Sequence, residues 1–139
     1  MRALALVLVI EFTSPALTHD YLWFERDWIS DAAATFAANP ALEKLTDNGR
    51  ERFRALFGKM WWHVGGGMLE STSPDLPPYT NAYTIRAIDE NSFELMVDNG
   101  MIVTVRRRGD GFCLVPDIAA SGGVKPQPYV VECFAPLDP

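Results

Sequence analysis

The spacing of apolar residues changes near residue 61 and divides the chain into two parts. Residues 17–60 place apolar side chains three and four positions apart, which is the period of an amphipathic helix. Residues 61–139 alternate apolar and polar side chains over short runs, as strands with one buried face do. The pattern therefore predicts a single domain over residues 17–139, with a helical part followed by an antiparallel sheet.

Capping residues define the expected helices more closely. Ser30 can cap a first helix, which Asn39-Pro40 ends. Asn48 can cap a longer helix, whose apolar residues recur at helical spacing: Phe53, Leu56, Phe57, Met60 and Trp61. We expect this stripe to lie in the core, so that replacing Phe57 by Ala lowers the free energy of unfolding by about 3–5 kcal/mol.

Five short runs rich in β-branched and aromatic residues are expected to be strands. They are residues 81–88, 92–97, 101–107, 112–116 and 129–134. Asp98-Asn99-Gly100 contains a hairpin signal, whereas residues 70–80 have the composition of a loop. Together these elements predict an α+β fold. In it, N-terminal helices pack on a curved antiparallel β-meander, which is a lipocalin-like or cone-like half-barrel.

The first residues have the layout of a secretory signal. Arg2 precedes an unbroken apolar run over residues 3–10, and Ser14 and Ala16 fit the −3 and −1 positions of a cleavage site. We therefore expect residues 1–16 to be a signal peptide and the protein to be periplasmic or secreted, with no integral membrane segment in the mature chain. The alternative is that the apolar run forms a buried first strand.

Two cysteines, Cys113 and Cys133, both lie in expected strands. In an exported protein an even number of cysteines indicates a disulfide, and only one pairing exists here. A bridge of this span contributes about 3 kcal/mol in the chain-entropy model. The alternative is a redox pair or metal ligands, but no C-x-x-C occurs and two cysteines cannot complete a zinc site.

The charge of the chain bears on its partners. A net charge of −6 and a sequence pI of about 4.8 make nucleic acid an unfavourable partner, because phosphate backbones are repelled. The run Arg106-Arg107-Arg108 at the end of an expected strand is interpreted as a solvated hairpin edge, with an anion site as the alternative.

Catalytic chemistry has little support in the sequence. It contains no phosphate loop, dinucleotide fingerprint, nucleophile elbow or His-Glu-x-x-His motif. The two histidines, His19 and His63, are the available general bases. We therefore expect no enzymatic activity, no cofactor and no metal. An enzyme with an enclosed cavity is a further interpretation, and it requires His63 or Asp31 to point inward.

Three segments of the chain resemble segments of a known group of proteins: "WISDAAAT" at 28–35, "LFGKM" at 56–60 and "YVVECF" at 129–134. The first has the form W-x-S-D-x-x-x-T. The combination resembles small exported bacterial proteins with a helical start and a lipocalin-like half-barrel. The resemblance implies a fold and a location in the cell envelope, and it implies no activity.

Aromatic residues gather where the expected helix gives way to the sheet. Trp61, Trp62, His63 and Tyr83 are the candidate ligand-binding residues, and the alternative is that they only fill the core. The sequence thus favours a non-enzymatic exported module that binds a small apolar ligand. The alternative is a protein-interaction module, such as an inhibitor or immunity-like partner of an envelope enzyme, which the acidic charge would steer to a basic surface.

Overall fold

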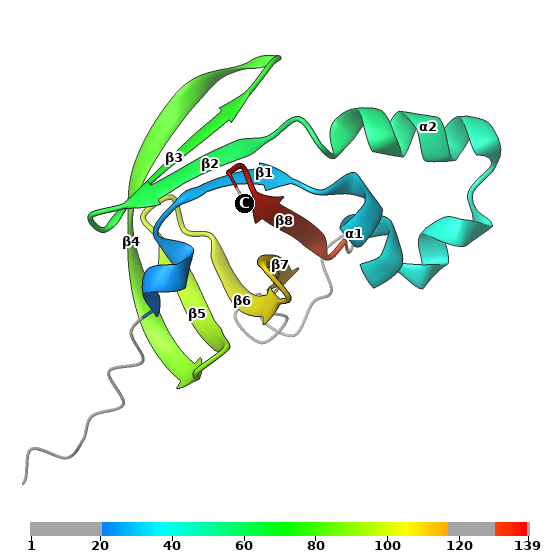
Figure 1. The fold of residues 1–139 in the computed structure, drawn as a ribbon. Helices are drawn as coiled ribbons and strands as arrows, with labels where there is room; N and C mark the ends of the chain where they lie inside the picture. Colours follow the sequence, from blue (N-terminus) through cyan, green and yellow to red (C-terminus); the bar gives the residue numbers. More distant parts are fainter. Residues whose placement is uncertain (1–20, 117–129, 139) are drawn as a thin grey trace, which may run out of the picture.

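The computed structural model describes residues 21–116 and 130–138 and contains eight strands, which close into a barrel (Figure 1). The helical elements are η1 (Tyr21–Phe24), α1 (Ala32–Ala38), η2 (Pro40–Lys44) and α2 (Asp47–Leu56). The first four strands are β1 (Asp27–Ser30), β2 (Trp61–Gly65), β3 (Met68–Ser73) and β4 (Leu76–Asp89). The others are β5 (Ser92–Val97), β6 (Ile102–Arg108), β7 (Gly111–Pro116) and β8 (Glu132–Pro136).

Closure of the sheet corrects the predicted fold class. Each strand pairs antiparallel with the next, and β1 also pairs with β8, with Ile29 opposite Ala135. The prediction of N-terminal helices packed on a half-barrel is therefore wrong: the sheet encloses its own core, and the two α-helices are short. The physical reason is β1, a four-residue strand within the part predicted to be helical. It pairs with β2 on one side and with β8 on the other, and so closes the barrel.

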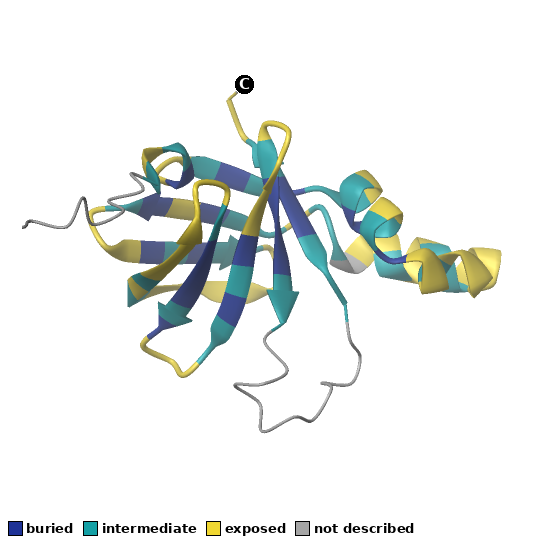
Figure 2. Cartoon of the chain, turned by 90° about the horizontal axis from the view of Figure 1, so that it is seen from below, coloured by how far each residue is buried: buried dark blue, intermediate teal, exposed yellow. Residues whose placement is uncertain are grey.

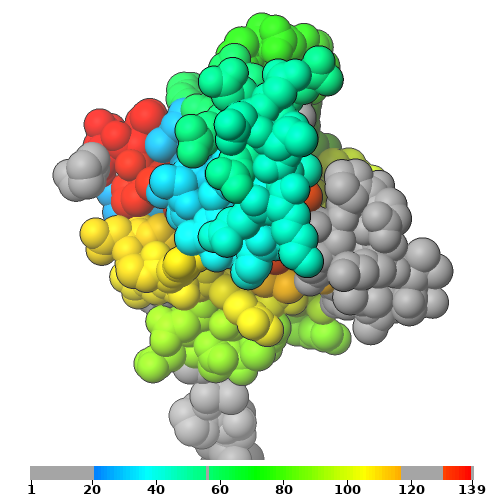
Figure 3. All heavy atoms as spheres, turned by 90° about the vertical axis from the view of Figure 1, so that its right-hand side faces the viewer, coloured from blue at the N-terminus to red at the C-terminus, as the bar shows by residue number. Residues whose placement is uncertain are grey.

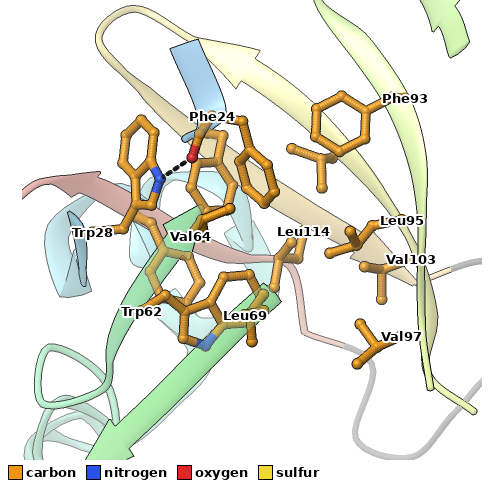
Figure 4. Packing of buried hydrophobic residues seen from close by; sticks show 13 residues of the cluster. Phe24, Trp28, Trp62, Val64, Leu69, Phe93, Leu95, Val97, Val103 and Leu114 are labelled. Carbon is orange, nitrogen blue, oxygen red and sulfur yellow. Dashed lines mark hydrogen bonds between the residues drawn. The ribbon is translucent and has the colours of Figure 1, made fainter. Parts of the chain in front are cut away.

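The core lies inside the barrel, where strand residues alternate inward and outward (Figure 2). On β5 the inward residues are Phe93, Leu95 and Val97, which share the buried face. Phe24, fully buried, enters the barrel from η1, and its carbonyl accepts a hydrogen bond from the indole of Trp28 at 2.9 Å (Figure 4). Aromatic rings thus fill the end of the barrel that η1 covers.

Helix α1 lies on the outside of β8 and is attached to it by polar contacts. Thr35 is fully buried, and its hydroxyl accepts a hydrogen bond from the Cys133 amide at 2.9 Å. The Asn39 side chain bonds both backbone groups of Val131, at 2.7 and 2.9 Å. Asp31, and not Ser30, caps α1 by accepting from Ala34.

Helix α2 projects away from the barrel (Figure 1), and in the view from that side the segment of α1 and α2 lies in front (Figure 3). Thr46 caps it instead of Asn48, and it ends at Leu56, before Gly58 takes a φ of +97°. The predicted apolar stripe therefore crosses an element boundary. Phe53 and Phe57 stack at 4.2 Å between ring centroids, and Phe53 lies 5.2 Å from Phe36 of α1, in a cluster outside the barrel.

The hydroxyl of Ser30 has a different role from the one predicted. It accepts hydrogen bonds from the amides of Gly58, at 2.6 Å, and Met60, at 3.2 Å. It therefore holds the chain where it returns from α2 into β2.

A long hairpin replaces the predicted loop over residues 70–80. β3 and β4 pair through this region, with Ser71 opposite Tyr79. β4 extends beyond β5, which pairs with it only from Tyr83 onward, so residues 76–81 are paired on one side (Figure 1). The composition was misleading because Pro77 and Pro78 lie on this one-sided extension, where a strand tolerates proline. The expected signal peptide, residues 1–16, lies outside the described residues.

Candidate functional site

The two ends of the barrel interior are packed differently. We call them the η1 end, where η1 covers the opening, and the α1 end, where β1 leads into α1. At the η1 end Phe93 and Val105 have no exposed surface. At the α1 end Val97 keeps 5%, and Val103 and Leu114 keep 8%. An eight-stranded barrel is just wide enough to be filled by side chains or to hold one small ligand. In this barrel the α1 end is the slightly less buried half.

Trp62 points into the α1 end. It is 3% exposed, lies opposite Ser71 of β3, and stacks on Phe134 with 4.7 Å between ring centroids. Its indole nitrogen is buried and has no hydrogen-bond partner in the described part of the chain. Figure 4 shows this nitrogen at the edge of the cluster away from Phe24. A donor inside an apolar wall is therefore left for an acceptor from outside the described residues.

Glu132 supplies a carboxyl group to the same region. It lies opposite Leu114 in the β7–β8 register, so it shares the inner face with Leu114 and with Phe134, two residues along β8. Its Oε1 atom is buried without a hydrogen-bond partner among residues 21–116 and 130–138. Burial raises the pKa of Glu132 to about 7, because an apolar environment disfavours the charged form. Near neutral pH a large fraction of this group is therefore protonated.

Polar groups are few at the α1 end of the barrel interior. Aliphatic and aromatic side chains form its walls, while Trp62, Ser71 and Glu132 offer a few polar groups. Tyr83 lies opposite Val97, but its ring packs on Phe24 of η1, with 6.1 Å between ring centroids, so it belongs to the η1 end. Burial raises the pKa of its phenol. Apolar walls with few convergent polar groups and a perturbed pKa are typical of binding sites.

The structure separates the four candidate ligand-binding residues. Trp62 and Tyr83 lie on the inner face, and Trp61 and His63 lie on the outer face. The alternation of β2 explains this, because neighbours in a strand point to opposite sides. Trp61 lines a shallow surface cleft of about 250 Å³ with Lys59, Thr72, Ser73 and Pro74.

His63 is exposed and pairs with Asp27 on the neighbouring strand β1. The hydrogen bond and the charge of Asp27 raise the pKa of His63. The interpretation as an enzyme required His63 or Asp31 to point inward, but His63 faces solvent and Asp31 caps α1 with its side chain. Neither residue therefore lies inside the barrel.

The predicted disulfide between Cys113 and Cys133 is confirmed. The disulfide joins two residues that lie opposite each other on β7 and β8. Both cysteines point to the outer face of the sheet, where they are buried next to α1. Within residues 21–116 and 130–138, no three His, Cys, Asp or Glu side chains come together as they would to hold a metal ion.

Sequence reasoning missed Glu132 and Ser71. A signal for Glu132 was present, because alternation in "YVVECF" places Glu132 on the same side as Phe134. Ser71 had no such signal, since its segment has the composition of a loop.

The fold defines a class: an antiparallel up-and-down barrel with a largely apolar interior. No family model, curated protein or solved structure matches this chain. None of the helices in the described ranges has the length and apolar character needed to cross a membrane.

Proposed function

We propose that the α1 end of the barrel binds a small, mostly apolar ligand that carries a hydrogen-bond acceptor. One observation carries the proposal: Trp62 and Glu132 each hold a buried polar atom on the inner face, unpaired within the described residues. A buried polar group without a partner costs about 1–3 kcal/mol. A ligand that accepts from the Trp62 indole and bonds the Glu132 carboxyl would recover part of that free energy and displace water from the apolar walls.

The barrel supports this binding geometry through its rigidity. Trp62 is paired on both sides, with Trp28 and Ser71, and Glu132, the first residue of β8, is paired with Leu114 of β7. Trp62 and Glu132 are also linked by Phe134, which stacks on the first and shares a face with the second. A site held in this way loses little conformational freedom on binding.

We further propose that the protein works outside the cytoplasm. The Cys113–Cys133 disulfide supports this, since such bonds persist in oxidising compartments. The leader-like residues 1–16 and the resemblance to exported bacterial proteins point the same way. N-terminal sequencing of protein from its source tests the location: a mature chain beginning at Leu17 is expected, and a chain that keeps residues 1–16 contradicts it.

Binding is tested with prodan, a neutral naphthalene ketone whose fluorescence reports the polarity around it. We expect a blue-shifted emission and saturable binding. Trp62→Phe, which removes the N–H and keeps an aromatic ring, should weaken binding about tenfold, as loss of one buried hydrogen bond does. Trp61→Phe is the matched control on the outer face and should change affinity less than about twofold.

The Glu132 carboxyl adds a pH dependence to the same assay. Because its pKa is about 7, raising the pH from 6 to 8 ionises the group and should weaken binding of a neutral ligand. Glu132→Gln should bind prodan equally at both pH values. Absence of saturable binding, or equal losses in Trp61→Phe and Trp62→Phe, would overturn the proposal.

A further inference from the structure

A cleft with two arginines lies at the η1 end, opposite the site described above. Its volume is about 210 Å³, and it is lined by Trp23, Arg26, Trp28, Arg107, Asp110 and Pro136. These residues come from η1, from the start of β1, from the end of β8 and from the β6–β7 hairpin. The space corresponds to about seven water molecules, which suits a small ion or the charged end of a small molecule.

Arg107 is placed in the cleft by the alternation of β6. Val103 and Val105 point into the barrel, so Arg107 shares their face where the strand ends, and its two arginine neighbours share the other. Its guanidinium lies over the ring of Trp23, 5.3 Å from the centroid. The three consecutive arginines, predicted to form a solvated hairpin edge, therefore do not act alike.

Arg26 is fixed in a similar way. Its guanidinium lies over Trp28, 5.5 Å from the ring centroid, and donates to the backbone carbonyl of Asp138. Stacking on an aromatic face leaves the N–H groups around the guanidinium edge available for other partners. Two such groups in one cleft provide the paired donors that carboxylate and phosphate bind.

Among the residues that the structure describes, no ion pair neutralises the positive charge of the cleft. The two salt bridges among the described residues, Asp27–His63 and Arg86–Glu94, include neither arginine. Asp110 also lines the cleft, but it forms a salt bridge with neither guanidinium. The indole nitrogen of Trp23 is buried and has no acceptor in the described ranges. In a protein of net charge −6, this cleft therefore offers unpaired donors and a local excess of positive charge.

We propose that this cleft binds the carboxylate or phosphate group of a small anion between Arg26 and Arg107. A bound anion relieves the repulsion between the two guanidinium groups and accepts hydrogen bonds from both. This site is separate from the α1 end, so its ligand does not depend on the function proposed there.

The test follows the Trp23 indole N–H by NMR during titration with inorganic phosphate and, separately, with benzoate. Assignment uses Trp23→Phe, and 100 mM NaCl screens long-range charge effects. We expect saturable shifts of the Trp23 signal with at least one anion, at a Kd of about 1 mM. The stronger of the two identifies the group that the cleft prefers.

Arg107→Gln should weaken binding at least about tenfold, since it removes a charged hydrogen-bond donor. Arg106→Gln is the matched control, because it makes the same change in charge one residue away, on the opposite face of β6. It should change the affinity less than about twofold. If Arg107→Gln does not fold, Arg107→Lys keeps the stem and the charge, and it should still bind at least about threefold more weakly.

Two results would overturn the proposal. One is that neither anion shifts the Trp23 signal up to about 50 mM, far above the expected Kd. The other is that Arg106→Gln weakens binding as much as the Arg107 variants do, which would show attraction by net charge alone.

Discussion

Replacing Glu132 by Gln tests the placement of this carboxyl group on the inner face of the barrel. The folded protein raises its pKa from 4.5 to about 7 through burial, whereas the unfolded chain keeps the ordinary value. Below pH 4.5 the group is protonated in both states and has no effect on the pH dependence of stability. As the pH rises from 4.5 to 7, the unfolded state ionises first, which favours unfolding.

The magnitude follows from the two pKa values. One pKa unit corresponds to about 1.4 kcal/mol, so a shift from 4.5 to about 7 amounts to about 3 kcal/mol. This stability is fully present below pH 4.5 and lost once the pH exceeds about 7. Glutamine stays neutral, so the variant should escape the loss. Compared with a typical domain stability of about 5–15 kcal/mol, the effect is large.

Urea unfolding at pH 4.5 and pH 8, followed by tryptophan fluorescence, measures the effect. The free energy of unfolding of the wild type, relative to Glu132→Gln, should fall by about 3 kcal/mol between the two pH values. Glu90→Gln, in the exposed β4–β5 turn, serves as the control and should follow the wild type. If wild type and Glu132→Gln show the same pH dependence, the carboxyl group is solvated and the inner-face site is wrong.

Two further predictions concern stability. Replacing both Cys113 and Cys133 by Ala should lower the free energy of unfolding by about 3 kcal/mol, measured by urea unfolding without reductant. A change below about 1 kcal/mol would show that strand pairing and the contacts with α1 keep β8 in place without the disulfide. Phe57→Ala should now cost less than about 2 kcal/mol, because Phe57 is half-buried outside the barrel, while Phe112→Ala should cost about 3–5 kcal/mol. Equal losses in the two phenylalanine variants would mean that the α2 cluster is part of the barrel core.

The strands that the sequence predicts correctly are those with strong local signals. Apolar and polar residues alternate clearly along β5 and β6. Gly100, with a φ of +94°, lies in the turn that the pair Asn99-Gly100 predicted. Closure of the barrel has no such signal. It depends on pairing between β1 and β8, which lie far apart in the sequence, and β1 is too short to show a period.

The residues of the candidate site also differ in how far the sequence predicts them. Trp62 could be predicted from the concentration of aromatic residues, and the period of two in β2 would have separated it from Trp61 and His63. Spacing places Glu132 on the same side as Phe134, but that this side faces the interior is known only from the register, in which Leu114 lies opposite Glu132. Long-range register, and not local preference, brings Trp62 and Glu132 to one end.

The one-sided extension of β4 bears on how the protein behaves at high concentration. Residues 76–81 carry a strand edge that β5 does not cover, and Leu76 and Tyr79 on it are 64% and 45% exposed. An apolar edge of this kind is normally a template on which another chain adds a strand and aggregation begins. Pro77 and Pro78 lack amide hydrogens, and because N–H groups of successive strand residues point to opposite edges, one of the two prolines removes a donor from the open edge. The hairpin thus exposes apolar side chains while resisting self-assembly through its backbone.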